Sequence, residues 1–335
     1  MDVHPGDVVY NTMRMWQGVS GVAPVGGIVS PAYTVCEPAG HVDGKFLGFL
    51  MKEPRLVAKF MNRSQGLVSD TWNLKYSEFK KIAVDLPPLA EQRRITEILD
   101  EVGAQIRRAG AEVSKLSKVF RGTLLQAMDV VRADPATVWR PVKEAGEVRL
   151  GRQRSPEHSE GEFMRPYLRV ANVFDGFIDY SDVMSMNFNP VEQERYELQP
   201  GDILLNEGQS LELVGRSALY DGPSGMFFQN TLVRFRTMTV LPEFARLVFK
   251  HWLDTGAFAD IAKKTTSIAH LGGDRFGAML FPIPSEDAQH RAMTAVREVR
   301  DASRQISQEV VKLKTLKKAL MDDLLTGKVR VPASA

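Results

Sequence analysis

The residues best suited to ligand chemistry in this sequence lie in loops and carry cationic, amide or hydroxyl groups. The stretch "GRQRSPEHSEGEFMR" (151–165) holds Arg152, Gln153, Arg154 and Arg165. An arginine fork matches the paired acceptors of a guanine edge or a phosphate, and a glutamine amide matches adenine. These residue types therefore suit nucleic-acid contacts, and a solvated charged loop is the alternative explanation.

Two other stretches of the same half carry similar groups. "NEGQSLELVGR" places Gln209 and Ser210 before an expected strand, with Arg216 at its end. "KKTTSIAH" (263–270) sets lysines beside hydroxyls, a combination that suits phosphate contact. A plain helix terminus with capping hydroxyls explains the second stretch equally well. The candidates in that stretch are Lys263, Lys264, Thr265 and Thr266.

The N-terminal half has counterparts in "NTMRMWQGVSG" and "NRSQGLVSDTW". The first supplies Arg14 and Gln17, and the second supplies Arg63 and Gln65. Trp16 fits a packed side chain as well as one stacked on a base. The sequence alone does not decide which of these side chains touch base edges.

Catalytic motifs are absent. No P-loop, H-E-x-x-H motif or paired Cys/His set occurs, and a lone Cys36 excludes an internal disulfide. "NPVEQ" (189–193) starts like an amino-methyltransferase signature, but it lacks the second proline and the aromatic residue. The formal net charge of +2 neither favours nor excludes a nucleic-acid partner. We expect no catalytic residue, no metal ligand and no cofactor.

Similar loops occur in both halves because the chain contains an internal repeat. "DLPPLAEQ" (85–92) returns as "PIPSEDAQ" (282–289), and the equivalent residues Leu86 and Ile283 are 283 − 86 = 197 positions apart. "PGDVVYN" returns as "PGDILLN" at 201 − 6 = 195. Anchors in the same order at nearly one period indicate two copies of one plan.

Each junction opens onto a long heptad stripe. Apolar residues recur at alternating steps of four and three, which is typical of a coiled-coil seam. We expect helices of roughly 35–40 residues, about 55–60 Å at 1.5 Å per residue, that pair with each other. Packing of each helix on its own domain is the alternative. The expected seam is Ile95, Leu99, Val102, Ile106, Val113 and Leu116, with Val296, Val299, Ile306, Val310, Leu313 and Leu320.

The material before each helix reads as short strands and hairpins, with Gly, Pro, Asn and Asp at the turns. The predicted class is α+β: two mixed-β domains alternate with two long helices that pair as an antiparallel coiled coil. The expected boundaries are 1–86 for the first domain, 87–132 for the first helix, 136–284 for the second domain, 285–326 for the second helix and 327–335 for a tail.

With these motifs in place, the chain resembles the DNA-specificity subunit of type I restriction–modification systems. The matching stretches are "LPPLAEQRRI", the "PGD" strands, "GQSLELVGRSALY", "FQNTLVRFR" and "SIAHLGGDRF". The resemblance implies a non-catalytic subunit that binds double-stranded DNA at a bipartite target. It also implies two target-recognition domains, and partners in the form of methyltransferase (modification) subunits and a motor-nuclease (restriction) subunit.

Charge on the second helix suggests where those partners dock. Lys312, Lys314, Lys317 and Lys318 are denser than solubility requires, although a solvated face is the commoner explanation of such a run. No apolar run of about 18 residues exists, and the start resembles no signal peptide, so we expect a cytoplasmic protein.

One departure from the family concerns the first domain. Its copy has five residues before Gly6, whereas the second copy begins near Val138, so about 57 residues (138 − 195 = −57) are expected to be missing from the first domain. Two other functions stay open: a coiled-coil scaffold whose β domains bind protein, and a silent cassette that donates a recognition domain by recombination.

Overall fold

The computed structural model describes residues 1–67, 72–265 and 267–332. Contacts divide the chain into two compact units: unit 1 is Met1–Ser114 with Arg304–Ala335, and unit 2 is Lys115–Ser303. Each unit contains one β-rich domain and one part of each long helix. The predicted α+β class, with two long helices that pack against each other, is confirmed.

Unit 1 is built on a small antiparallel sheet whose strand order is β3-β2-β5. Helices α1 and α2 pack on it around Tyr10 and Phe46, which are almost fully buried. Beside it, β1 pairs with β4. The elements are β1 Asp2–Val3, β2 Val8–Asn11, η1 Met15–Gln17, β3 Ser20–Val22, β4 Gly27–Ile28, β5 Tyr33–Cys36, α1 Gly44–Leu50, α2 Pro54–Arg63 and α3 Tyr76–Phe79.

Unit 2 has a four-stranded antiparallel sheet in the order β12-β10-β14-β7. Helix α7 (Pro242–Thr255) packs against this sheet through Phe244 and Phe249, which have no exposed surface. Smaller sheets are β13-β8-β9, β11-β16-β15 and β17-β6.

The strands of unit 2 are β6 Val138–Pro141, β7 Gly146–Leu150, β8 Met164–Leu168, β9 Met184–Asn187, β10 Ile203–Asn206, β11 Gly208–Gln209, β12 Ser217–Leu219, β13 Phe227–Phe228, β14 Leu232–Thr237, β15 Lys263–Lys264, β16 Ala269–His270 and β17 Leu280–Ile283. Its short helices are α5 Val142–Ala145, η3 Pro156–His158, α6 Pro190–Tyr196, α8 Ala257–Ile261 and α9 Gly273–Ala278.

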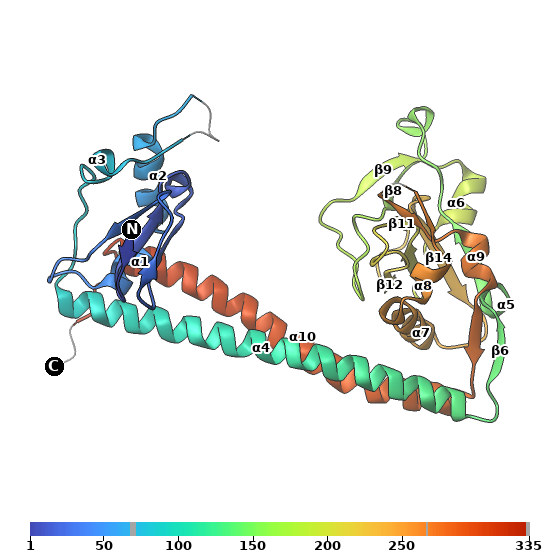
Figure 1. The fold of residues 1–335 in the computed structure, drawn as a ribbon. Coiled ribbons are helices and arrows are strands. Elements are labelled where there is room, and N and C mark those ends of the chain that lie inside the picture. The colour runs from blue at the N-terminus through green and yellow to red at the C-terminus, as the bar shows by residue number, and fades with distance from the viewer. Residues whose placement is uncertain (68–71, 266, 333–335) are drawn as a thin grey trace. The chain divides into compact units, whose positions relative to one another are not determined.

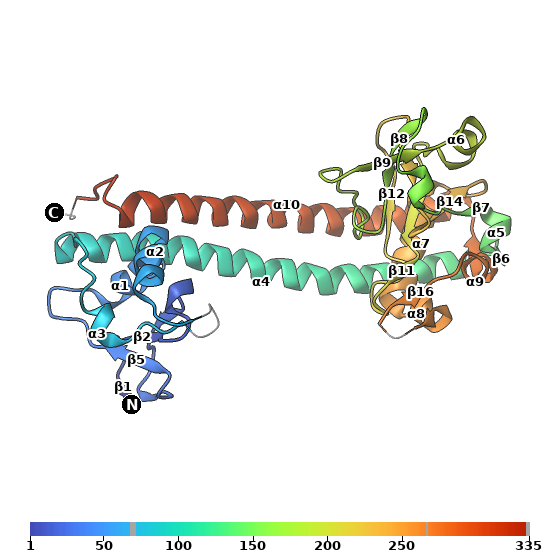
Figure 2. The ribbon, with the colours of Figure 1, turned by 90° about the horizontal axis from the view of Figure 1, so that it is seen from above.

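The long helices are α4 (Leu89–Ala133) and α10 (Glu286–Leu325), and they run side by side in opposite directions within each unit (Figure 2). In unit 1, Ile95 and Leu99 share an apolar cluster with Leu324. In unit 2, Leu124 shares one with Val296. The predicted seam residues are buried or half-buried at heptad spacing, and exposed residues lie between them.

A buried glutamine ties each long helix to the domain before it. Gln92 and Gln289 are 1% and 4% exposed. Each accepts a hydrogen bond from the N-cap residue of the packing helix, Asp43 N–H at 2.9 Å and Leu241 N–H at 2.8 Å. Each also donates to the carbonyl of a proline five positions earlier, at 2.8 and 3.2 Å. The repeated junction in the sequence therefore places a buried glutamine at the start of each long helix, and its hydrogen bonds join that helix to the preceding domain.

The internal repeat is equally plain in the backbone. Gly6 and Gly201 both have φ of +95°, in the region where a side chain is strained, and each opens the turn into the central strand. Equivalent hydrogen bonds follow: Leu74 N–H to Thr12 O at 2.8 Å matches Leu271 N–H to Glu207 O at 2.8 Å.

Carboxylates form hydrogen bonds near the ends of the two long helices. In unit 2, the Asp134 carboxylate accepts from the N–H and the hydroxyl of Ser285, both at 2.8 Å, and these bonds lower the pKa of Asp134. In unit 1, Glu91 accepts from the Arg330 guanidinium at 2.6 and 2.8 Å and from Val331 N–H at 3.1 Å. The carboxylates thus hold a helix start and the C-terminal segment in place.

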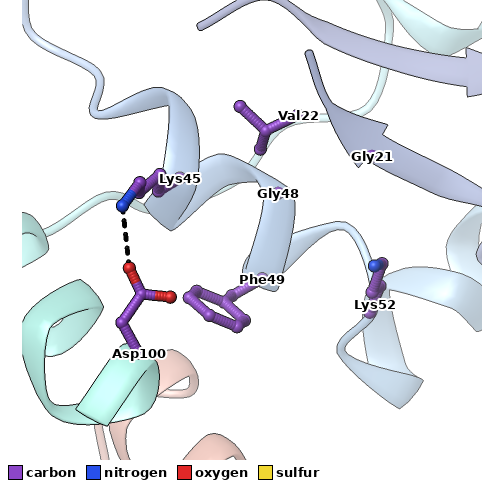
Figure 3. Close-up of a pocket in the computed structure, with 7 residues that line it drawn as sticks. All are labelled: Gly21, Val22, Lys45, Gly48, Phe49, Lys52 and Asp100. Atoms are coloured by element: carbon purple, nitrogen blue, oxygen red, sulfur yellow. Dashed lines mark hydrogen bonds and ion pairs between the residues drawn. The ribbon is translucent and has the colours of Figure 1, made fainter. Parts of the chain in front are cut away.

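In unit 1, α1 also docks on α4 beside β3, as Figure 3 shows. Lys45 donates to Asp100 at 2.9 Å, which raises the pKa of Lys45. Gly48 lets α1 approach β3, because a Cβ at this position would lie 2.5 Å from Cγ2 of Val22. The ammonium of Lys317 lies 5.2 Å from the centre of the Phe49 ring.

Within the described residues, no helix is long and apolar enough to cross a membrane. The same part of the chain contains no group of three or more His, Cys, Asp or Glu residues placed to hold a metal ion.

Candidate nucleic-acid interface

Two loops of unit 2 that are far apart in sequence meet in the sheet β11-β16-β15. Gln209 of β11 and Lys264 of β15 both pair with Ala269 of β16, one from each side. Directly paired residues of antiparallel strands project to the same face, so the amide and the ammonium lie on one face about 10 Å apart, two strand spacings. An amide that can read a base edge thus lies near a cation that can bind a phosphate.

Neighbouring groups hold this corner in place. The Oε1 of Gln209 accepts from Ser210 N–H at 3.1 Å, which fixes the amide. The pKa of Glu212 is lowered by its own backbone N–H and by Ser210, and the charge of Lys264 lowers it further. His270 Nδ1 lies 2.9 Å from Glu207 Oε2. Lys263, Lys264 and Thr265 are exposed, whereas Gln209 and Ser210 are half-buried.

Arg152 does not have the exposed position that the sequence suggested. Its side chain is 6% exposed, and its Nε donates to Glu192 at 2.7 Å. The guanidinium also lies 5.2 Å from the centre of the Phe188 ring. An arginine that is ion-paired and buried in this way holds the domain together, so it is not available to a base or a phosphate.

The other candidates of the same loop differ in exposure. Gln153 and Arg154 are exposed. Arg165 lies on β8, is half-buried, and donates to Gln193 Oε1 at 3.4 Å and to Met164 O at 3.2 Å. The exposed pair therefore has the greatest freedom to contact a ligand.

Arg216 is also partly committed to the domain. Its guanidinium lies 4.9 Å from the centre of the Phe174 ring, and burial lowers its pKa. An arginine stacked on an aromatic ring in a partly dry site stabilises the local packing. Its access to a ligand is correspondingly smaller than that of Lys264.

Unit 1 places its candidates in the equivalent position. Arg14 and Gln17 are exposed at either end of η1, and Gln65 forms an isolated bridge with Asn73. This bridge corresponds to the pairing of β15 with β16 in unit 2. Arg63 is 48% exposed and pairs with Glu78 at 3.3 Å.

Trp72 and His270 lie beside the candidate residues but were not predicted from the sequence. Trp72 meets Trp16 edge-on, with ring centres 5.4 Å apart, so Trp16 is packed in this structure. His270 is not among the residues predicted from the sequence, although its place in the central strand of a short sheet puts it beside both loops. Thr266 lies outside the described residues.

Comparisons with known proteins agree on one family. Residues 12–112 match the model of the "Type I restriction modification DNA specificity domain". The specificity subunit of the EcoKI type I restriction enzyme of Escherichia coli K12 is 25% identical over 283 residues, which are 79% of this chain and 60% of that protein. A putative MjaX specificity subunit of Methanocaldococcus jannaschii is 22% identical over 167 residues, 48% of this chain and 39% of its own.

Solved structures show the same fold. An S subunit of a type I restriction–modification system from M. genitalium superimposes with a TM-score of 0.56 at 13% identity, over 96% of this chain and 83% of that one. A chain from a study of complex assembly and conformational transition of the type I R-M system gives 0.58 at 17% identity, over 98% and 83%. Together with the family model and the curated relatives, these likenesses confirm the predicted resemblance of the chain to type I restriction–modification specificity subunits.

Proposed function

We propose that the chain binds double-stranded DNA in a sequence-specific manner. The observation that carries this proposal is the corner at which Gln209 and Lys264 flank Ala269. A half-buried amide held by Ser210 offers a preorganised group to a base edge, and an exposed lysine offers a phosphate contact. The exposed Gln153 and Arg154 are the additional candidates in this unit.

The repeat extends the proposal to a bipartite target. Unit 1 carries Arg14, Gln17 and Gln65 on the loops that correspond to those of unit 2. Each domain would then read one half of the target. Because both copies use the same plan, the two halves differ through loop residues and not through architecture.

Within such a system the chain supplies recognition and its partners supply catalysis. We propose that modification (methyltransferase) and restriction (motor-nuclease) subunits assemble on it. Lys312, Lys314 and Lys318 are exposed on α10 and form a candidate docking face. Lys317 is not part of this candidate docking face, because its ammonium packs on the Phe49 ring and burial lowers the pKa of Lys317.

The experiment is a selection of bound DNA from a randomised duplex pool, followed by titration of the recovered site at several salt concentrations. A bipartite consensus with salt-dependent affinity supports the proposal. Equal binding of all sequences would favour a scaffold role, in which the β domains bind protein. Reversal of charge at Lys314 and Lys318 should weaken co-purification with a modification subunit and leave DNA binding intact.

A further inference from the structure

The sheet β11-β16-β15 has a second face, on the side opposite the Ala269 side chain. Ala269 and Leu271, which flank His270 in the chain, are 1% and 0% exposed, and both belong to the core cluster of unit 2. Because successive residues of a strand project to opposite faces, the side chain of His270 points away from that core. Its imidazole is 43% exposed, so it is accessible to a ligand.

His270 is the centre of a row of three directly paired residues on this face. Gly208 of β11 pairs with it on one side, and Lys263 of β15 pairs with it on the other. A Cβ added to Gly208 would lie 3.5 Å from Cε1 of His270, so the ring lies against this glycine. Lys263 is exposed. The imidazole is therefore flanked by a cation on one strand and by a residue without a side chain on the other.

Glu207 fixes the orientation of the ring. The Nδ1 of His270 lies 2.9 Å from Oε2 of Glu207, whose side chain is 16% exposed. Since carboxylate oxygens only accept hydrogen bonds, Nδ1 carries a proton and donates it. The backbone of Glu207 is held as well, because its N–H donates to Thr231 O at 2.9 Å and its carbonyl accepts from Leu271 N–H at 2.8 Å. In the described part of the chain, Nε2 forms no hydrogen bond and is the ring atom left for a ligand.

A second cation lies near this row. Arg275 of α9 is exposed, and its Nη2 donates to the carbonyl of His270 at 2.7 Å. Its guanidinium lies against Gly272, because a Cβ at this glycine would be 2.5 Å from Nη2. Together with Lys263, this arginine places two positive charges near the imidazole. Such charges favour a polyanion and suit the phosphates that flank a base.

The repeat shows which part of this arrangement is specific to unit 2. At the period of 197 positions, His270 corresponds to Asn73, and Glu207 corresponds to Thr12 at 207 − 12 = 195. A polar residue thus occupies the central position in both copies. The carboxylate does not recur, and the hydroxyl of Thr12 donates to Ala32 O at 3.0 Å. The pair of His270 and Glu207 is therefore a property of one domain, as is required of a group that distinguishes one half of a target from the other.

We propose that His270 is a specificity-determining residue, whose Nε2 accepts a hydrogen bond from an exocyclic amino group of a base, and that Glu207 is its positioning residue. The proposal rests on the DNA-binding function proposed above and adds one base contact to it. A neutral imidazole that keeps its proton on Nδ1 has its acceptor at Nε2, which fits the amino group of adenine or cytosine in the major groove. Lys263 and Arg275 contact neighbouring phosphates.

The test uses the full chain and the DNA site recovered by the selection described above. His270→Ala should reduce the preference at one base pair about tenfold and leave the other positions unchanged. A base analogue without the amino group, purine for adenine or 2-pyrimidinone for cytosine, should weaken binding of the parent chain at that base pair by the same factor. The His270→Ala variant should bind the analogue and the natural base equally well.

Glu207→Ala tests the positioning role. It should weaken the preference at the same base pair and at no other, whereas a general loosening of the sheet would lower the affinity for all sequences. The double variant His270→Ala/Glu207→Ala should show no further loss, because both residues act through one hydrogen bond.

His290→Ala is the matched control. His290 lies on α10, is 58% exposed, and also has a carboxylate neighbour, since its Nε2 lies 3.7 Å from Oε1 of Glu286. It is not part of the sheet β11-β16-β15. This variant should therefore bind every base variant like the parent chain.

The outcomes separate a failure of this proposal from a failure of the proposed function. If the parent chain binds all sequences alike, the DNA-specificity function itself is wrong. If the parent chain has a consensus that His270→Ala and His290→Ala retain equally, the function stands and the role of His270 is wrong. A loss in His270→Ala that neither base analogue reproduces in the parent chain would also overturn the proposal, because the ring would then not accept from an amino group.

Discussion

Gln209 and Lys264 lie on the two strands that flank Ala269, and both residues pair with it in one three-stranded sheet. This arrangement joins a loop near residue 210 to another near residue 265. It also gives the two side chains separate tasks, since an amide can discriminate bases and a lysine contributes charge.

The first prediction separates these two tasks. Gln209→Ala should lose about 1–3 kcal/mol of discrimination at one base pair, with an unchanged salt dependence. Lys264→Ala should weaken binding to all sequences alike and reduce the salt slope by about one. Titrations over single-base variants and over salt check both expectations. Identical behaviour of the two variants would show that the corner does not divide its roles in this way.

The second prediction concerns Arg152, which is buried against Glu192. Arg152→Ala should lower the free energy of unfolding by on the order of 3 kcal/mol, because it leaves a partly buried carboxylate without its partner. Arg154→Ala is the matched control from the same exposed loop, and it should leave stability unchanged. Chemical denaturation measures both. Equal stability of the two variants would mean that the Arg152 ion pair contributes nothing.

The sequence predicted the repeat and the paired helices because both rest on local, periodic signals. A turn glycine such as Gly6 and a heptad stripe can be recognised without knowledge of the tertiary structure. The burial of Arg152 could not be predicted, because its partner Glu192 lies forty positions away and the contact leaves no periodic signal in the sequence. The pairing of Gln209 with Ala269 was equally invisible, since strands of two residues leave no alternation to detect.

The third prediction tests the junction glutamines. Gln289→Ala should lower the free energy of unfolding of unit 2 by about 1–3 kcal/mol, because Leu241 N–H loses its acceptor in a buried place. Gln289→Glu keeps the acceptor for Leu241 N–H but removes the donor to the carbonyl of Pro284, so this variant should also have a measurably lower free energy of unfolding. Gln305→Ala changes an exposed glutamine of the same helix and serves as the control. Equal denaturation midpoints for Gln289→Ala and Gln305→Ala would show that the hydrogen bonds of Gln289 do not stabilise the junction.

The last prediction is a pH dependence at the start of α4. The bond from Arg330 lowers the pKa of Glu91 below its ordinary value of 4.5, and Val331 N–H lowers it further. A carboxyl whose pKa is lower in the folded state contributes stability above its unfolded pKa and loses that stability as pH falls through its folded pKa. The parent chain should therefore lose stability below about pH 4.5, and Glu91→Gln should remove that part of the decline. Because Arg330 is 66% exposed, added salt should reduce the effect as well. Denaturation midpoints of both chains between pH 3 and 7 provide the measurement, and parallel curves would show that the pair does not couple to folding.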